Sequence, residues 1–132
     1  MTTLREGRSL GARAFGARGE ALAADWLERQ GYRILARKFT IPGGEIDLVA
    51  LRGDAIAFVE VKARGSVEIA LSAITEGKRR RLARAAAAWV AQNPWAAQGH
   101  TLRGDAVFLD GRGAPLHIED AFALELEGQA WL

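Results

Sequence analysis

The stretch GEIDLVALRGDAIAFVEVK, residues 44–62, decides the fold because it predicts a β-hairpin that carries charged side chains inside both strands. Residues 45–51 alternate polar and apolar side chains, and residues 55–63 are rich in β-branched and aromatic side chains, patterns that are typical of strands. Between them, Arg52-Gly53-Asp54 has the composition of a tight turn. If the turn holds two residues, Arg52 pairs with Ala55 and the register of the hairpin follows.

Counting outward from that turn brings four charged side chains together. Asp47 is expected opposite Glu60 and Glu45 opposite Lys62, with the Cβ atoms of cross-strand partners about 5 Å apart. Side chains two residues apart in a strand share a face, so all four should project to one side of the sheet. Their apolar neighbours are expected on the other side: Ile46, Leu48, Val59 and Val61.

Two carboxylates held this close repel each other unless a cation, a shared proton or a lysine neutralises them. Magnesium fits best, because it takes oxygen ligands from one or two carboxylates and completes its shell with water and substrate phosphate. A lysine beside such an ion can position or deprotonate the attacking water and offset charge in the transition state. The alternative is a surface hairpin whose acids form ordinary ion pairs with Lys62, and the residues alone leave both interpretations open.

The spacing of these residues resembles a nuclease signature. Asp47, a spacer of twelve residues and Glu60-Val61-Lys62 resemble the aspartate and Glu-x-Lys motif of restriction-endonuclease-like nucleases. The resemblance is closer to the YraN family of predicted bacterial nucleases, which is similar to archaeal Holliday-junction resolvases, and it covers residues 15–118. Three segments carry it: Gly16-x-x-Gly19-Glu20, Gly44-Glu45-Ile46-Asp47-Leu48 and Phe58-Val59-Glu60-Val61-Lys62-x-Arg64.

The resemblance implies a restriction-endonuclease-like fold and a nuclease that hydrolyses DNA phosphodiester bonds, with branched DNA as the first substrate to test. It implies that Mg²⁺, or Mn²⁺ as a substitute, is held by Asp47, Glu60 and Glu20, and that Lys62 assists the attacking water. These four residues are therefore the expected catalytic residues. For Glu20 the competing interpretation is a helix-surface glutamate paired with an arginine.

Two positions depart from the family pattern. Ile46 precedes the aspartate where the wider superfamily often has proline. Ala36-Arg37-Lys38 stands where relatives commonly carry an asparagine. Neither departure removes an expected metal ligand.

Composition sets the class of protein. The 132 residues, 49% of them hydrophobic, fit one compact domain with a modest core. The chain has no cysteine and two histidines, which excludes disulfides and argues against a zinc site. The N-terminal residues contain no apolar signal core, and the apolar run at residues 85–91 is far too short to span a bilayer, so we expect a soluble cytoplasmic protein without membrane contact.

Positive charge is concentrated in the first part of the chain. Residues 105–132 hold six acids and one arginine, which leaves 17 basic and 10 acidic residues, a net charge of +7, in the rest. A basic body suits a polyanionic partner, although solubility alone is a sufficient reason for it. We expect nucleic-acid contacts from Arg64 and from a basic cluster for which a solvated surface is the alternative: Lys78, Arg79, Arg80, Arg81 and Arg84. Lys78 also matches a lysine of the family pattern.

Two helices are predicted outside the hairpin. The first spans residues 14–30 and ends at Gly31, a C-terminal cap, and the second runs from an N-cap at Thr75 to Gln92. In the first helix Glu20 shares a face with small residues that allow close approach to a sheet and draw its carboxylate inward. A bulky stripe lies on another face: Phe15, Leu22 and Trp26.

The remaining segments complete the expected fold. A basic arm covers residues 1–13, strands are predicted over residues 32–39, 101–109 and 116–118, and the glycines of Pro42-Gly43-Gly44 are expected to let a phosphate backbone approach. The expected fold is one α/β domain over residues 14–132. Its core order is α-β-β-β-α-β, with a mixed sheet flanked by helices and the acidic site at one edge of the sheet.

Two alternatives to a nuclease remain from other functional classes. One is a non-catalytic nucleic-acid-binding module with a degenerate site, and the other is an interaction scaffold whose basic helix docks an acidic protein. Asp105 is expected to pair with Arg103 rather than to support the metal site. Trp131 either packs on the body or meets a second copy in a homodimer, and the sequence does not decide between them.

Overall fold

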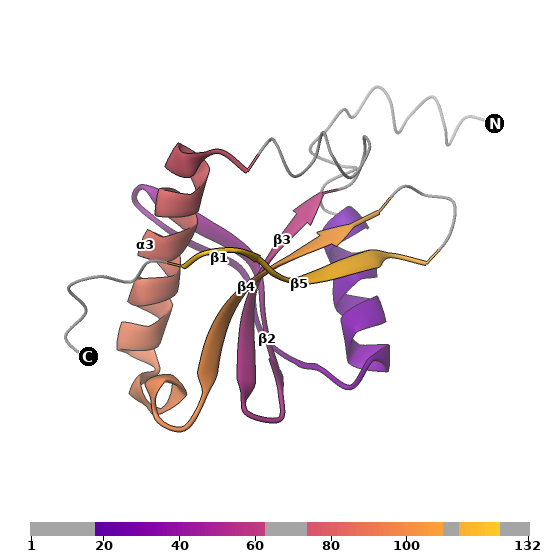
Figure 1. The fold of residues 1–132 in the computed structure, drawn as a ribbon, viewed down its shortest axis with the longest axis horizontal. Helices are drawn as coiled ribbons and strands as arrows, with labels where there is room; N and C mark the ends of the chain where they lie inside the picture. Colours follow the sequence, from indigo (N-terminus) through magenta and orange to yellow (C-terminus); the bar gives the residue numbers. More distant parts are fainter. Residues whose placement is uncertain (1–17, 63–73, 110–113, 125–132) are drawn as a thin grey trace.

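The computed structural model describes residues 18–62, 74–109 and 114–124 (Figure 1). The basic arm, Arg64 and Trp131 lie outside the described residues. The elements follow the expected order, with an additional short 3-10 helix: a helix over residues 18–29, which we call the N-terminal helix, then β1 (Arg33–Ile41), β2 (Gly44–Arg52), β3 (Ala55–Lys62), α3 (Glu76–Gln92), η1 (Pro94–Ala97), β4 (Thr101–Phe108) and β5 (Leu116–Phe122).

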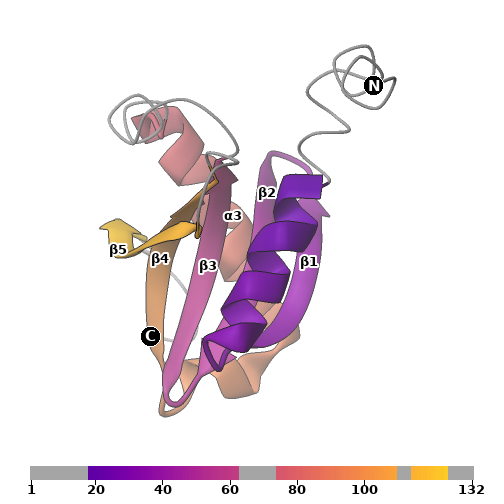
Figure 2. The same cartoon turned by 90° about the vertical axis from the view of Figure 1, so that its right-hand side faces the viewer.

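The strands form one five-stranded mixed sheet in the order β1-β2-β3-β4-β5. β1, β2 and β3 form an antiparallel meander, β4 runs parallel to β3 after the crossover through α3, and β5 returns antiparallel to β4. α3 covers one face of the sheet and the N-terminal helix covers the other (Figures 1 and 2). The result is a single α/β domain consistent with the restriction-endonuclease-like fold.

The register of the central hairpin is the one predicted from the turn. Arg52 pairs with Ala55, and the ladder continues outward as far as Leu48 and Val59. Gly53 has a positive φ of 61°, which a tight hairpin turn requires and glycine adopts at little cost. The hairpin is therefore confirmed over the part that fixes its register.

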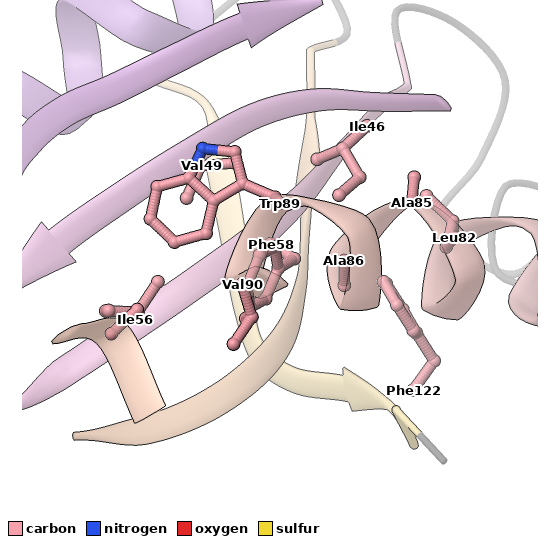
Figure 3. Packing of buried hydrophobic residues seen from close by; sticks show 11 residues of the cluster. Ile46, Val49, Ile56, Phe58, Leu82, Ala85, Ala86, Trp89, Val90 and Phe122 are labelled. Atoms are coloured by element: carbon pink, nitrogen blue, oxygen red, sulfur yellow. The ribbon is translucent and has the colours of Figure 1, made fainter. Parts of the chain in front are cut away.

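The α3 face holds the larger core cluster (Figure 3). Phe58 and Trp89 meet edge to face with their ring centroids 5.8 Å apart, a favoured geometry for aromatic pairs. The predicted stripe of α3 is buried: Leu82, Ala85, Ala86 and Trp89. This cluster fixes α3 against the strands that carry the site.

The opposite face is closed by the small residues of the N-terminal helix. Ala23, Ala24 and Leu27 are fully buried against strand residues that include Leu48 and Val59. Small side chains allow this helix to lie close to the sheet, as expected from the sequence. Of the predicted bulky stripe, Leu22 is 53% exposed, whereas Trp26 is partly buried against this cluster.

Two predicted caps are also confirmed, whereas the predicted start of the first helix at residue 14 lies outside the described residues. Thr75 is the N-cap of α3, and its hydroxyl accepts a hydrogen bond of 3.2 Å from the backbone N–H of Lys78. Gly31 ends the N-terminal helix with a φ of 95°, and the next N–H returns to the carbonyl of Leu27 at 3.0 Å. Among the described residues, no helix is both long and apolar enough to cross a membrane.

Gly44 has a packing role in place of the one expected. A Cβ at this position would lie 2.6 Å from the carbonyl oxygen of Arg81 and 3.1 Å from the Cβ of Ala85. The start of β2 therefore meets the backbone of α3 so closely that only glycine fits. Gly44 admits a helix, not a phosphate backbone.

Candidate functional site

One pocket collects side chains from the N-terminal helix, β2, β3 and α3. It lies at the ends of β2 and β3, which are interior strands, and not along an edge strand as expected. The pocket brings all four predicted catalytic residues together. Its lining is Glu20, Glu45, Asp47, Glu60, Val61, Lys62, Lys78, Arg81 and Leu82.

The alternation of side chains between the two faces of the sheet is interrupted in β2 at Asp47. Ile46 packs with the cluster under α3, whereas Leu48, two residues on, packs under the N-terminal helix. A regular strand would place both on one face, so the expectation that Ile46 shares a face with Leu48 is wrong. The cause is an irregularity that the sequence pattern does not reveal.

Lys38 marks that irregularity on the neighbouring strand. Arg37 pairs with Leu48 and Phe39 pairs with Ile46, but the intervening residues Lys38 and Asp47 do not form a ladder pair. Lys38 has a φ of 48°, in the left-handed region that non-glycine residues rarely adopt. The interrupted ladder leaves the side chain of Asp47 free to turn toward β3 and the pocket.

Asp47 is partly buried and accepts one backbone hydrogen bond, from the N–H of Val61 to Oδ2 at 2.8 Å. Burial, together with the negative charge of Glu60, raises the pKa of Asp47 to about 8, and the Val61 hydrogen bond offsets only part of this rise. Glu20 adds repulsion and a hydrogen bond that favours the protonated carboxyl group. The pocket is therefore short of positive charge at Asp47.

Glu60 is in the opposite situation. It is only 5% exposed, and its Oε2 lies 3.0 Å from Nζ of Lys62 and 2.8 Å from Nζ of Lys78. Burial lowers the pKa of Lys78, but its hydrogen bonds to Glu60 and Lys62 and the negative charges of Glu60 and Asp47 together outweigh this effect, so the net pKa is raised. Lys78, predicted only as a nucleic-acid contact, is therefore a member of the acidic site.

Glu20 and Glu45 border the same pocket. Oε1 of Glu20 lies 4.0 Å from Nζ of Lys38 on β1, and no arginine of the described ranges forms the ion pair of the competing interpretation. Glu45 is exposed. The alternative interpretation, a surface hairpin, involved cross-strand ion pairs with Lys62. Among the described residues Lys62 forms no ion pair with Glu45 and instead contacts Glu60 of its own strand.

The donor chemistry of the pocket suits a hard divalent cation. Asp47, Glu60 and Glu20 offer carboxylate oxygens, the ligands that Mg²⁺ and Mn²⁺ prefer, and the raised pKa of Asp47 reports missing positive charge. Within residues 18–62, 74–109 and 114–124, no three acidic or histidine side chains already stand as a complete ligand set. The lysines occupy Glu60 Oε2, so a metal ion would have to compete with them for that oxygen.

The basic cluster of α3 does not act as a unit. Arg81 lines the pocket, and Arg84 lies against the β1–β2 turn, where its Nη1 would be 2.9 Å from a Cβ at Gly43. Arg80 instead lies 3.7 Å from Glu76 on the exposed side of the helix, and neither Arg79 nor Arg80 lines the pocket. The spacing along one helix separates these two groups.

A second polar cluster surrounds Asp105 on β4. Arg103 donates two hydrogen bonds of 2.8 Å to its carboxylate, which confirms the expected pair. His117 Nε2 lies 2.7 Å from Oδ2, and the backbone N–H of Asp120 donates to Oδ1 at 3.0 Å. Tyr32 accepts from Arg103 at 2.7 Å.

The sequence pattern misses the last three partners. Their positions are far from Asp105 in the chain, so no local periodicity connects them. The available signal is the acid within the apolar run of β4, because a fully buried carboxylate requires several donors. That signal predicts that Asp105 has hydrogen-bond donors nearby, but it does not identify the residues that supply them.

Comparison with known proteins agrees with the motifs. The model of the family described as "Uncharacterised protein family UPF0102" matches residues 19–109. A UPF0102 protein of Methylobacterium nodulans is 53% identical over 121 residues, which cover 92% of this chain and 92% of that protein. The UPF0102 protein RPA0323 of Rhodopseudomonas palustris is 51% identical over 107 residues, which cover 81% of this chain and 82% of that protein. The chain therefore belongs to the uncharacterised protein family UPF0102, the YraN family that its motifs resemble.

Proposed function

We propose that this protein is a magnesium-dependent nuclease that hydrolyses phosphodiester bonds in DNA. The observation that carries the proposal is the convergence of Glu20, Asp47, Glu60 and Lys62 from three elements on one pocket. The side chains come from positions up to 42 residues apart in the sequence, yet they form one acidic site with lysine beside it. A structural ion-pair network would not require Asp47 to stay short of a cation.

Asp47, Glu60 and Glu20 would hold the metal ion. Bound there, a divalent cation lowers the pKa of a water molecule and stabilises negative charge on phosphate oxygens. The three carboxylates come from rigid elements, two strands and a helix packed on the sheet, which favours a fixed arrangement around substrate.

Lys62 is the residue best placed to act on the attacking water. Its Nζ lies 3.0 Å from Glu60, so the ammonium group stays close to the oxygens that bracket the reacting phosphate. In that position it can orient the nucleophile and offset charge that develops on phosphorus-bound oxygens. Lys78, on the same oxygen of Glu60, balances the carboxylate and fixes its orientation.

The test compares cleavage by wild type, Glu60→Gln and Lys62→Ala on duplex, flap, single-stranded and four-way-junction DNA with Mg²⁺ or Mn²⁺. We expect both substitutions to lower the cleavage rate at least about 100-fold, because each removes a charge that the chemistry uses. Glu28→Gln makes the same change on an exposed part of the N-terminal helix and should cut like wild type. An EDTA reaction should show no cleavage.

Glu60→Gln should still bind DNA as tightly as wild type, because it removes a negative charge near phosphate. Lys62→Ala should bind slightly more weakly. Equal cleavage by wild type and both variants would place the chemistry elsewhere. Cleavage of none of these DNAs by wild type, with either metal, would reject the nuclease.

A non-catalytic nucleic-acid-binding module is the second candidate function. The observation that favours it is the capture of Glu60 Oε2 by both Lys62 and Lys78, which gives the pocket an internal charge balance without a metal. In that case wild type should bind DNA equally well with EDTA and with Mg²⁺, and cleave under neither condition.

A further inference from the structure

The basic residues of α3 that face the site form a row with a spacing of three. Lys78, Arg81 and Arg84 occupy positions i, i+3 and i+6, and side chains three residues apart are neighbours on the surface of a helix. Lys78 contacts Glu60 inside the pocket, Arg81 forms part of the pocket wall, and Arg84 lies over Gly43 in the β1–β2 turn. We call these three residues the basic row.

The outer two members of the basic row form no ion pair with any described acid. Arg81 and Arg84 are exposed, and in the described part of the chain no carboxylate lies within 4 Å of either guanidinium group. Arg80, in contrast, has Glu76 at 3.7 Å. Two arginines that form no ion pair within the described ranges thus lie directly beside a pocket that collects carboxylates.

We propose that Arg81 and Arg84 bind successive phosphates of the nucleic-acid strand whose reacting phosphate lies at Asp47 and Glu60. The strand then leaves the site along α3 toward the β1–β2 turn. The identity of this ligand rests on the proposed function, since a strand that reaches the pocket carries further phosphates at regular spacing. The inference adds a path and two contacts that the acidic site does not supply.

The dimensions of the basic row agree with this path. An α-helix rises about 1.5 Å per residue, so the six steps from Lys78 to Arg84 span about 9 Å. One strand of a duplex advances about 3.4 Å along its axis per phosphate. With α3 lying along the duplex axis, the row therefore spans about two such axial steps of one strand.

Close packing holds the row in place. Gly44 brings the β2 backbone against the carbonyl of Arg81 and the Cβ of Ala85, so α3 has little freedom to slide over the sheet at this point. Gly43 has no side chain, and this leaves the space that the guanidinium of Arg84 occupies. A fixed helix can hold two guanidinium groups at a constant distance from the pocket, which favours recognition of a regular phosphate backbone.

The experiment compares the loss of the two outer arginines of the basic row with the loss of two other arginines of the same helix, which do not line the pocket. The double variants Arg81→Gln/Arg84→Gln and Arg79→Gln/Arg80→Gln lose equal charge, and binding to fluorescein-labelled duplex DNA is measured in EDTA at a series of salt concentrations. We expect the first variant to reduce the logarithmic salt slope by about 1.8, two phosphate contacts at about 0.9 each, and the second to change it by less than half as much. Arg81→Lys/Arg84→Lys, which keeps the charge, should restore most of the slope.

A second measurement locates the contacts on the strand. Single phosphates are replaced by neutral methylphosphonates, at each of the three positions on either side of the reacting phosphate. Wild type should lose affinity for two adjacent substitutions on one side only, and the Arg81→Gln/Arg84→Gln variant should be indifferent to those two. Equal salt slopes for the two glutamine variants, or equal sensitivity of wild type and variant to every methylphosphonate, would overturn the path.

These results separate the path from the nuclease. If no DNA is cut but the two glutamine variants differ as expected, the path stands and the catalytic proposal fails. If DNA is cut and the variants bind alike, the nuclease stands and the path fails. Poly-glutamate serves as an acidic polypeptide probe: binding that needs Arg81 and Arg84, together with no measurable DNA binding, would overturn the path in favour of a protein partner.

Discussion

Asp47 and Asp105 are two aspartates on interior strands of one sheet, and both lie where the strand pairing is interrupted. Asp47 is absent from the β1–β2 register, and Asp105 falls where the β4–β5 register shifts between Gly104 and Ala106. Each interruption has a non-glycine residue with a left-handed backbone beside it, Lys38 in one case and Asp120 in the other. No other non-glycine residue in the described ranges has a positive φ.

The two carboxylates differ in what surrounds them. Burial alone would raise the pKa of Asp105, but hydrogen bonds from His117, Arg103 and the Asp120 backbone lower it overall. Asp47 has one backbone donor and two carboxylate neighbours, and its pKa is raised. We therefore interpret Asp105, with its donors present, as a structural element and Asp47, which is partly buried with one donor, as a candidate ligand-binding group.

The largest effect is expected from Asp105→Asn. The substitution leaves the guanidinium group of Arg103 and the imidazole of His117 without their anionic partner inside the fold. The free energy of unfolding at pH 7 should therefore fall by about 3 kcal/mol. Urea denaturation measures this difference, and Asp54→Asn in the exposed hairpin turn is the control. A loss no greater than that of the control would show that the network around Asp105 is dispensable.

The same variant tests the direction of the pKa. A carboxyl group whose pKa is lowered by folding stabilises the protein above its unfolded value, near 3.8, and loses that contribution as the pH falls through its folded value. The stability difference between wild type and Asp105→Asn should therefore be constant between pH 5 and 7 and should shrink at lower pH. A difference that grows as the pH falls below 4 would contradict the lowered pKa.

Asp47→Asn should have the opposite sign. The pKa of Asp47 rises from 3.8 to about 8 on folding, so the folded protein binds a proton more tightly and its stability falls as the pH rises between these values. In EDTA at pH 9 the variant should be more stable than wild type by about 1–2 kcal/mol, with little difference near pH 4. Lower stability of the variant at pH 9 would show that Asp47 is satisfied in the native protein, as Asp105 is.

Metal binding should distinguish the two aspartates by calorimetry. Mg²⁺ or Mn²⁺ is expected to bind weakly to the free protein and more tightly with DNA present, because phosphate oxygens supply missing ligands. Asp47→Ala should abolish the heat of binding, whereas Asp105→Asn, measured where it remains folded, should retain it. Identical heats for wild type and Asp47→Ala would remove Asp47 from the metal site.

Much of the site around Asp47 can be predicted from the sequence, because it depends on the turn and on the alternation of side chains within single strands. The turn fixes the register that brings Asp47 near Glu60, and alternation along β3 predicts that Glu60 and Lys62 meet. The change of facing at Asp47 is not accessible, because it depends on a backbone irregularity in a neighbouring strand. The partners of Asp105, and the contact of Lys78 with Glu60, arise when distant segments pack together, and a periodic pattern carries no record of such contacts.

The smallest effect is expected from a substitution at Lys38. The two interrupted strand pairings differ in the residue that adopts the left-handed backbone, which is a lysine in β1 and an aspartate in β5. Aspartate and asparagine tolerate this conformation better than lysine does, and β4–β5 already uses Asp120 there. Lys38→Asn should therefore raise the free energy of unfolding by roughly 0.5 kcal/mol, since the lost pair with Glu20 at 4.0 Å is largely exposed on the lysine side and contributes little. Lys38→Gln removes the same charge without relieving the backbone, and Arg37→Asn introduces the same residue at a neighbour with ordinary φ; neither should stabilise the protein. If Lys38→Asn is no more stable than Lys38→Gln in urea denaturation at pH 7, the left-handed backbone at Lys38 costs nothing measurable and the parallel with Asp120 ends at geometry.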